Sequence, residues 1–135
     1  MANVNVLLNS ASIQVLDGAT LTYRINTPVG TVTLPATAAD YDSFVQIAGG
    51  AGTILDLPGP TAWFVYVKNL DVAANLSVLF QVTGGALLTL ANAPMLTPGG
   101  VFIYANPIEF AGAGMIAITL VSSAGPSPAE ILLAG

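Results

Sequence analysis

The sequence predicts an all-β protein, an antiparallel β-sandwich or barrel formed by a single domain over residues 1–135. Short runs rich in β-branched and aromatic residues recur about every eight to twelve positions, and Gly, Pro, Asn and Asp separate them. No long segment has the 3.6-residue period of an amphipathic helix. A chain of 135 residues suits one domain with a core of its own.

The expected strands follow these runs in chain order. They cover residues 4–8, 12–16, 20–25, 31–34, 43–47, 53–57, 63–69, 76–82, 87–90, 101–104, 116–122 and 131–134. The only place where we expect a helical turn is Pro35 to Asp42, and the small residues from Ala48 to Gly52 predict a loop.

Two of the runs alternate between apolar and polar residues, as a half-buried strand does. The inward sets expected from this alternation are Leu21, Tyr23 and Ile25 in the run 20–25, and Leu76, Val78, Phe80 and Val82 in the run 76–82.

Two other runs, 63–67 and 101–104, are apolar on both faces. One interpretation is a central strand whose second face lies under a loop or a second layer. The other is a face that meets a neighbouring subunit, with Phe64, Tyr66, Phe102 and Tyr104 as the interface anchors, because aromatic residues are enriched in interface cores.

Turn residues stand between several of the runs. Asp17-Gly18 suits a tight hairpin, and Gly84-Gly85 can adopt the positive φ angles of primed turns. Pro98-Gly99-Gly100 predicts a sharp reversal, since proline favours the second position of a turn and glycine the third.

The charge composition excludes several classes of function. The chain has no His, no Cys, two Lys and Arg residues and seven Asp and Glu residues. This inventory lacks the usual groups of nucleophilic, zinc and phosphoryl-transfer catalysis, so we expect a protein that is not an enzyme and holds no cofactor. A net charge of −5 argues against a nucleic-acid partner.

A membrane-spanning helix is also not expected. The stretch between Asp71 and Glu109 has no charge, but Gly84-Gly85, Pro94, Pro98 and Pro107 interrupt it. The opening residues Met1 to Val6 lack a basic segment and resemble a strand rather than a signal peptide.

The few acidic and basic residues do not predict a metal site or a catalytic site. Asp40-x-Asp42 could start a calcium or magnesium site, but two carboxylates fall short of the oxygen ligands such a cation needs, and solvation in a loop is the simpler expectation. Paired carboxylates for glycoside hydrolysis lack the aromatic cleft that holds sugar rings. Arg24 and Lys68 are expected to face acidic partners across strands.

The second half of the chain resembles small bacteriophage virion proteins. The likeness lies in Trp63 to Leu70, Leu76-Ser77-Val78, Leu96 to Tyr104 with its Pro-Gly-Gly turn, and Ala117 to Ser123. It covers roughly residues 60 to 135 and consists of strand and turn types. No catalytic residue accompanies that group, and the first half matches no family we can name.

The resemblance implies a jelly-roll-like β-sandwich in a virion, most often a trimeric capsid decoration (cement) protein that binds the major capsid protein. In such an oligomer the run Val4 to Leu8 could add to a strand of a neighbour. Two alternatives stay open: a carbohydrate- or receptor-binding module of a tail or adhesin, with Trp63 or Tyr41 as the aromatic platform, and a small jelly-roll shell protein.

Overall fold

The computed structural model confirms the all-β prediction. It describes residues 4–8, 11–17, 20–27, 32–36, 39–105 and 114–135, and none of these is helical. A helix that could cross a membrane is therefore not found in the described part of the chain.

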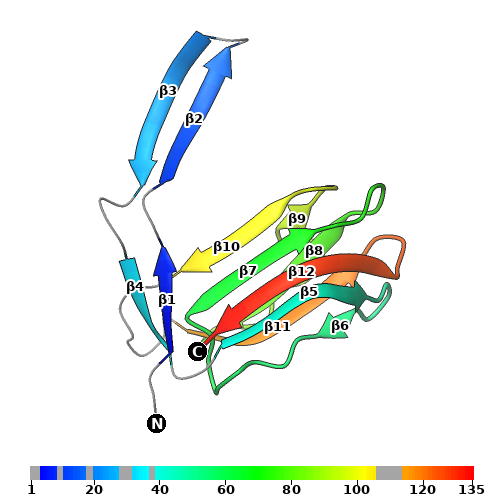
Figure 1. The fold of residues 1–135 in the computed structure, drawn as a ribbon. Coiled ribbons are helices and arrows are strands. Elements are labelled where there is room, and N and C mark those ends of the chain that lie inside the picture. The colour runs from blue at the N-terminus through cyan, green and yellow to red at the C-terminus, as the bar shows by residue number, and fades with distance from the viewer. Residues whose placement is uncertain (1–3, 9–10, 18–19, 28–31, 37–38, 106–113) are drawn as a thin grey trace.

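Eight strands form a sandwich of two antiparallel four-stranded sheets (Figure 1). In the first sheet, β10 (Val101–Ala105), β7 (Phe64–Asn69), β12 (Ser127–Ala134) and β5 (Ala39–Ile47) lie side by side in that order. In the second sheet the order is β6 (Thr53–Ile54), β11 (Met115–Ser122), β8 (Leu76–Val82) and β9 (Met95–Leu96).

The strand pairs of the sandwich are nested along the chain. Between neighbouring strands, β5 pairs with β12, β6 with β11, β7 with β10, and β8 with β9. The segment from β5 to β8 is therefore matched, in reverse order, by the segment from β9 to β12. The pairs alternate between the two sheets, so this nested hairpin is folded over on itself to make both layers.

The core lies between the two sheets and is built from alternate residues of each strand. Val65, Val67, Ile131 and Leu133 come from the first sheet, and β8, β11 and β9 contribute from the second. The expected inward set of residues 76–82 is confirmed: Leu76 and Val78 are fully buried, and Phe80 and Val82 pack against the same cluster.

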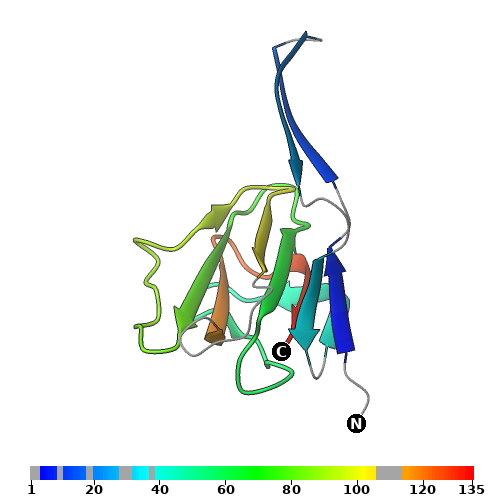
Figure 2. The same ribbon diagram turned by 90° about the vertical axis from the view of Figure 1, so that its left-hand side faces the viewer.

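The first four strands form two-stranded ribbons outside the sandwich. β1 (Val4–Leu8) pairs with β4 (Val32–Ala36), and β2 (Ala11–Asp17) pairs with β3 (Thr20–Thr27). We call the β2–β3 ribbon the arm. It extends away from the sandwich in both ribbon views (Figures 1 and 2). The pairing of Asp17 with Thr20 confirms the hairpin expected at Asp17-Gly18, while Gly18 itself lies outside the described residues.

Several local predictions need correction. Ala39 to Asp42 belong to β5 and Pro35-Ala36 to β4, so these residues are strand and not a helical turn, because both segments have partner strands.

Residues 87–90 are not a strand. Of these four residues only Leu88 bonds to the backbone of β8, where its N–H donates to the Phe80 carbonyl. The Thr89 N–H donates to Asn92 Oδ1, which closes a turn. The short strand β9 follows instead. The expected inward residues Leu21, Tyr23 and Ile25 have side chains outside the described part.

The Pro98 turn is confirmed. Gly100 N–H donates to the Thr97 carbonyl at 2.8 Å, and Gly99 has a φ of 79°. That angle suits glycine in the third position of a turn with proline in the second. The turn delivers the chain into β10 at the edge of the first sheet.

Asn69 joins the end of β7 to the loop that follows it and to β9. Its side chain is fully buried, and Nδ2 donates to the carbonyls of Ala74 and Leu96, each at 2.9 Å. Its Oδ1 accepts from the Asp71 N–H at 3.0 Å. One buried amide therefore bonds to three backbone groups, two in the loop after β7 and one in β9.

Replacing Asn69 by alanine should lower the free energy of unfolding by about 2–4 kcal/mol, because buried carbonyls lose their donors. Urea denaturation monitored by Trp63 fluorescence measures this change. Gln46 is exposed on β5, so Gln46→Ala is the control and should change stability by less than about 0.5 kcal/mol. Equal effects of the two substitutions would show that the Asn69 bonds add nothing.

Candidate interaction surface

The outer face of the first sheet carries a continuous row of large apolar and aromatic residues. The strand register places Ile103 beside Tyr66, Tyr66 beside Leu132, and Leu132 beside Tyr41. Positions aligned in this way across a sheet share one face. The row thus crosses all four strands of the sheet.

Much of this row is open to solvent, together with two residues beside it. Ile103 is 59% exposed and Tyr41 57%, while Val101 and Phe44 are 46% and 57% exposed. Val101 is aligned with Lys68 of β7, and Phe44 lies at the bulge where β5 passes Glu130. We call Tyr41, Phe44, Tyr66, Val101, Ile103 and Leu132 the apolar face.

A carboxylate lies within the apolar face and is held by two tyrosines. The Tyr41 hydroxyl donates to Glu130 Oε2 at 2.6 Å, and the Tyr66 hydroxyl donates to Glu130 Oε1 at 2.7 Å. Both carboxylate oxygens are occupied, so strands β5, β12 and β7 are linked on their outer side. Such charge-assisted bonds are the stronger kind of hydrogen bond.

These bonds shift the pKa values of all three side chains. The Tyr41 and Tyr66 hydroxyls lower the pKa of Glu130, and nearby Lys68 lowers it further. The bond to Glu130 raises the pKa of Tyr66 to about 12, and it also raises the pKa of Tyr41. The register aligns Lys68 with Glu130, which confirms the acidic cross-strand partner expected for this lysine. Arg24 is aligned with Gln14 instead.

The four anchors expected from the sequence divide between the two sides of the sheet. Tyr66 belongs to the apolar face, and Phe64 alternates with Val65 toward the same side but is only 5% exposed. Phe102 and Tyr104 pack against the core between the sheets. The residues that accompany Tyr66 on the outside are Ile103, Val101, Tyr41 and Phe44 instead. Because successive residues of a strand face opposite sides of the sheet, the sequence could have placed Phe102 and Ile103 on different sides.

Trp63 does not offer an aromatic platform, because it is only 8% exposed. Tyr41 remains accessible, although its hydroxyl is engaged by Glu130. Other exposed apolar side chains lie on the second sheet and in the loops before and after β8. They are Ile54, Met95 and Ile116 on the sheet, and Val72, Leu87 and Leu90 in the loops.

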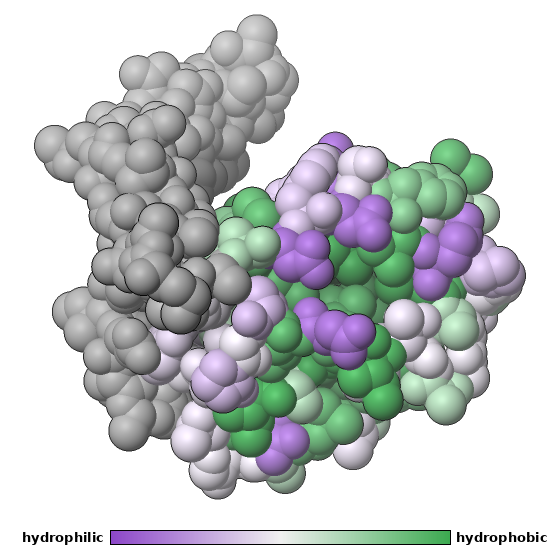
Figure 3. Space-filling view, turned by 60° about the horizontal axis from the view of Figure 1, so that its bottom comes forward, coloured by the Kyte–Doolittle hydropathy of each residue, from purple (hydrophilic) through white to green (hydrophobic). Residues whose placement is uncertain are grey.

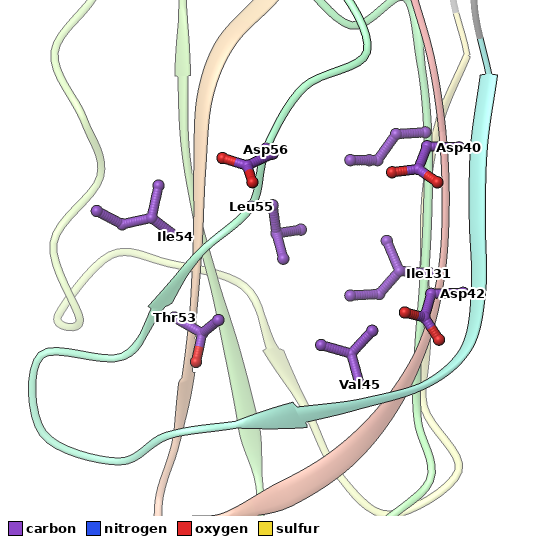
Figure 4. A pocket seen from close by; sticks show the side chains of 9 residues that line it. Asp40, Asp42, Val45, Thr53, Ile54, Leu55, Asp56 and Ile131 are labelled. Atoms are coloured by element: carbon purple, nitrogen blue, oxygen red, sulfur yellow. The ribbon is translucent and has the colours of Figure 1, made fainter.

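A pocket of about 220 Å³ opens between β5 and β6, at the edge where the two sheets part. That side of the molecule mixes hydrophobic with hydrophilic residues (Figure 3). Asp40 and Asp42 lie on one wall and Asp56 on the other, with Leu55, Val45 and Ile131 between them (Figure 4). Asp40 and Asp42 are part of a strand, so the expectation of a solvated loop there was wrong.

The pocket does not gather a metal-ligand set. Among the described residues, no group of three His, Cys, Asp or Glu side chains is arranged to hold a metal ion. The carboxylates of Asp40 and Asp42 are separated from that of Asp56 by aliphatic side chains (Figure 4). The pocket is therefore an apolar hollow with acidic side chains on its walls.

Comparisons with known proteins give no relative for this chain. No family model matches it, and no curated protein and no solved structure is significantly similar to it.

The stabilising effect of Glu130 should depend on pH. Its pKa is lower in the folded protein than the ordinary value of 4.5, so its contribution is present above that value and is lost as the pH falls through the folded pKa. Glu130→Gln should therefore melt below the wild type at about pH 7 and approach it at about pH 3. Thermal denaturation across this range measures the difference.

Tyr66→Phe serves as the companion variant, because it removes one of the two bonds and keeps the carboxylate. It should lose a smaller part of the same pH-dependent stability. A constant gap between Glu130→Gln and the wild type at all pH values would contradict the assigned role of the carboxylate.

Proposed function

We propose that the protein is a non-enzymatic structural component of a virus particle, an oligomeric capsid decoration protein that binds a phage head. A homotrimer is the oligomer we favour, and the major capsid protein is its partner. The protein would act by covering apolar surface at repeated subunit interfaces, and this burial would strengthen the particle.

The observation that carries the proposal is the isolation of the arm. β2 and β3 make their main contacts with each other, and the ribbon points away from the sandwich (Figure 1). A lone two-stranded ribbon is marginally stable in water at best, and three or more strands are needed for independent stability. A further strand or surface from another molecule would supply what the arm lacks.

The apolar face supports the same proposal. Ile103, Tyr41 and Phe44 are each more than half exposed, and the row that contains Ile103 and Tyr41 spans the sheet. Contiguous exposed apolar patches on small domains mark sites of association. Tyrosine and phenylalanine are also the residue types enriched in interface cores. Charged side chains make up only 7% of the chain, so few remain to cover this face.

The strand topology supports a jelly roll as the finer description of the sandwich. Nested pairing of eight strands, folded into two four-stranded sheets, is the arrangement that two interlocked Greek keys produce. Jelly rolls form viral capsid domains and also lectin domains. Because one fold serves many functions, the topology alone does not choose between these two uses.

Binding of a carbohydrate or receptor is a second candidate, favoured by the two exposed aromatic rings of Tyr41 and Phe44 on one face. Glycan-array binding that disappears in Phe44→Ala, with the melting temperature unchanged, would support it. An assembly protein should give no such signal.

A change on the apolar face should weaken self-association. Phe44→Asp places a charge on an exposed residue, so the fold should survive while the dissociation constant of the oligomer rises about tenfold or more. Light scattering over a concentration series gives the mass, to be compared with 13.6 kDa for one subunit.

Ile54→Asp provides the matched control, because Ile54 is 76% exposed on the other sheet. It should leave the mass unchanged. A wild-type protein that stays monomeric at micromolar concentration and binds no capsid would contradict the proposal. Closed particles formed by the purified protein, seen by electron microscopy, would indicate a shell protein instead.

A further inference from the structure

β10 is an edge strand with little to prevent another strand from joining it. It lies at the end of the first sheet, and among the strands that the structure describes it pairs with β7 alone. Its five residues include no charge and no proline. Edge strands in natural proteins are usually protected by charges, proline, bulges or very short length, and an apolar edge without them is a site for strand addition.

The other three edges of the sandwich are protected in these ways. β6 and β9 are two residues long. β5 is long, but it has a bulge opposite Glu130 and directs Asp40 and Asp42 into the pocket below it. Inward-pointing charges and bulges both discourage edge pairing. Among the sandwich edges, only β10 lacks such a feature.

The hydrogen-bond pattern shows which backbone groups β10 offers. Asn69 N–H donates to the Gly100 carbonyl at 3.0 Å, which makes this a hydrogen-bonded pair of the β7–β10 ladder. Such pairs recur at every second residue, so Phe102 bonds toward β7. The N–H and carbonyl groups of Val101 and Ile103 therefore point outward, along the open edge of the sheet.

We propose that this edge receives the arm of a second copy of the chain, so that β2 or β3 becomes a fifth strand of the first sheet beside β10. The proposal rests on the self-association proposed above and names one of its contacts, at the opposite edge of the sheet from Phe44. An added strand would bring backbone hydrogen bonds to Val101 and Ile103 and would extend the row of the apolar face.

Three observations favour the arm as the occupant. The arm has two strands where three are needed for stability, so joining a sheet would complete it. β2 and β3 have seven and eight residues, enough to cover the five of β10. The arm also points away from its own sandwich, which directs it to a neighbouring molecule (Figures 1 and 2).

Proline at position 103 tests for strand addition directly. Because the Ile103 N–H points outward, Ile103→Pro should leave the β7–β10 ladder intact, as edge strands accept proline at such positions. It removes a donor that an added strand would use. Ile103→Ala is the control, since it shortens the same side chain but keeps the N–H. Ile103→Pro should associate at least about tenfold more weakly than Ile103→Ala.

Equal association of the two variants would overturn strand addition at β10. Hydrogen exchange in the wild type gives the same answer without any substitution, should Ile103→Pro fail to fold. The Val101 and Ile103 amides should be protected in the oligomer and exchange in the dilute monomer. Rapid exchange of both amides in a stable oligomer would refute the inference while leaving the proposed function in place.

Disulfide cross-linking identifies the occupant, and the chain has no cysteine of its own to interfere. Ile103→Cys protein is mixed with differently tagged protein that carries a single cysteine on the arm, at Gln14, Val15, Thr22 or Tyr23. These positions sample both strands and both faces. A cross-link needs Cα atoms within about 7 Å, so a mixed product between the two tagged proteins supports the arm.

Two other results of the cross-linking would count against the arm. Ile103→Cys protein linked only to itself would indicate that two β10 edges pair with each other. The absence of any cross-link in a stable oligomer would exclude β10 as the contact. A wild type that is monomeric at every concentration would remove the proposed function together with this inference.

Discussion

The structure depends on one constraint, the alternation of side chains across strands in a chain with very few charges. Each sandwich strand directs every second residue into the core, and Val65, Val67, Leu76 and Val78 are fully buried there. The intervening residues must face outward. Since charged residues make up 7% of the chain, several of those outward residues are apolar or aromatic. The same alternation therefore produces both the core and the apolar face.

Polar groups in this molecule act mainly as links between strands and loops. Asn69 bonds to backbone groups of the loop after β7 and of β9, and Glu130 joins three strands through Tyr41 and Tyr66. Bonds from the Ala74 and Ala73 N–H groups to Asp71 close the loop after β7 and lower the pKa of that carboxyl group. No buried side-chain nitrogen or oxygen among the described residues lacks a partner. The few polar side chains that the described interior holds are thus hydrogen-bonded.

The nested strand pairing places the two ends of the sandwich segment side by side and leaves the arm outside both sheets. β5 begins the sandwich and β12 ends it, and the two strands are neighbours. The four strands before β5 belong to neither of the four-stranded sheets. They pair among themselves in the β1–β4 ribbon and in the arm. Among the described strands, the arm and the edge of β10 are therefore the two features on which the proposed self-association rests.

Local patterns predicted the elements well where one face of a strand is buried and the turn residues are specific. The run 76–82 matches β8 at both ends, and the Thr97 to Gly100 turn has the expected geometry, because alternation and a Pro-Gly pair act over a few residues. Residues 87–90 and Pro35 to Asp42 were misjudged, since their structure depends on whether a partner strand is available. Alternation places Phe102 and Tyr104 on one side of β10 and Val101 and Ile103 on the other, but only the packing of the two sheets shows that Phe102 and Tyr104 face the core.

The sequence by itself determined the fold class, the positions of most strands and the small number of charged side chains, since these follow from residue types and short-range periodicity. Only the tertiary structure decided which strands are edges, which aromatic residues face outward and that Tyr41, Glu130 and Tyr66 meet. Residues 41 and 130 are far apart in the chain, and their contact is set by the register of β5 against β12. Strand register and sheet order come from the packing of the whole domain, which no local run of residues encodes.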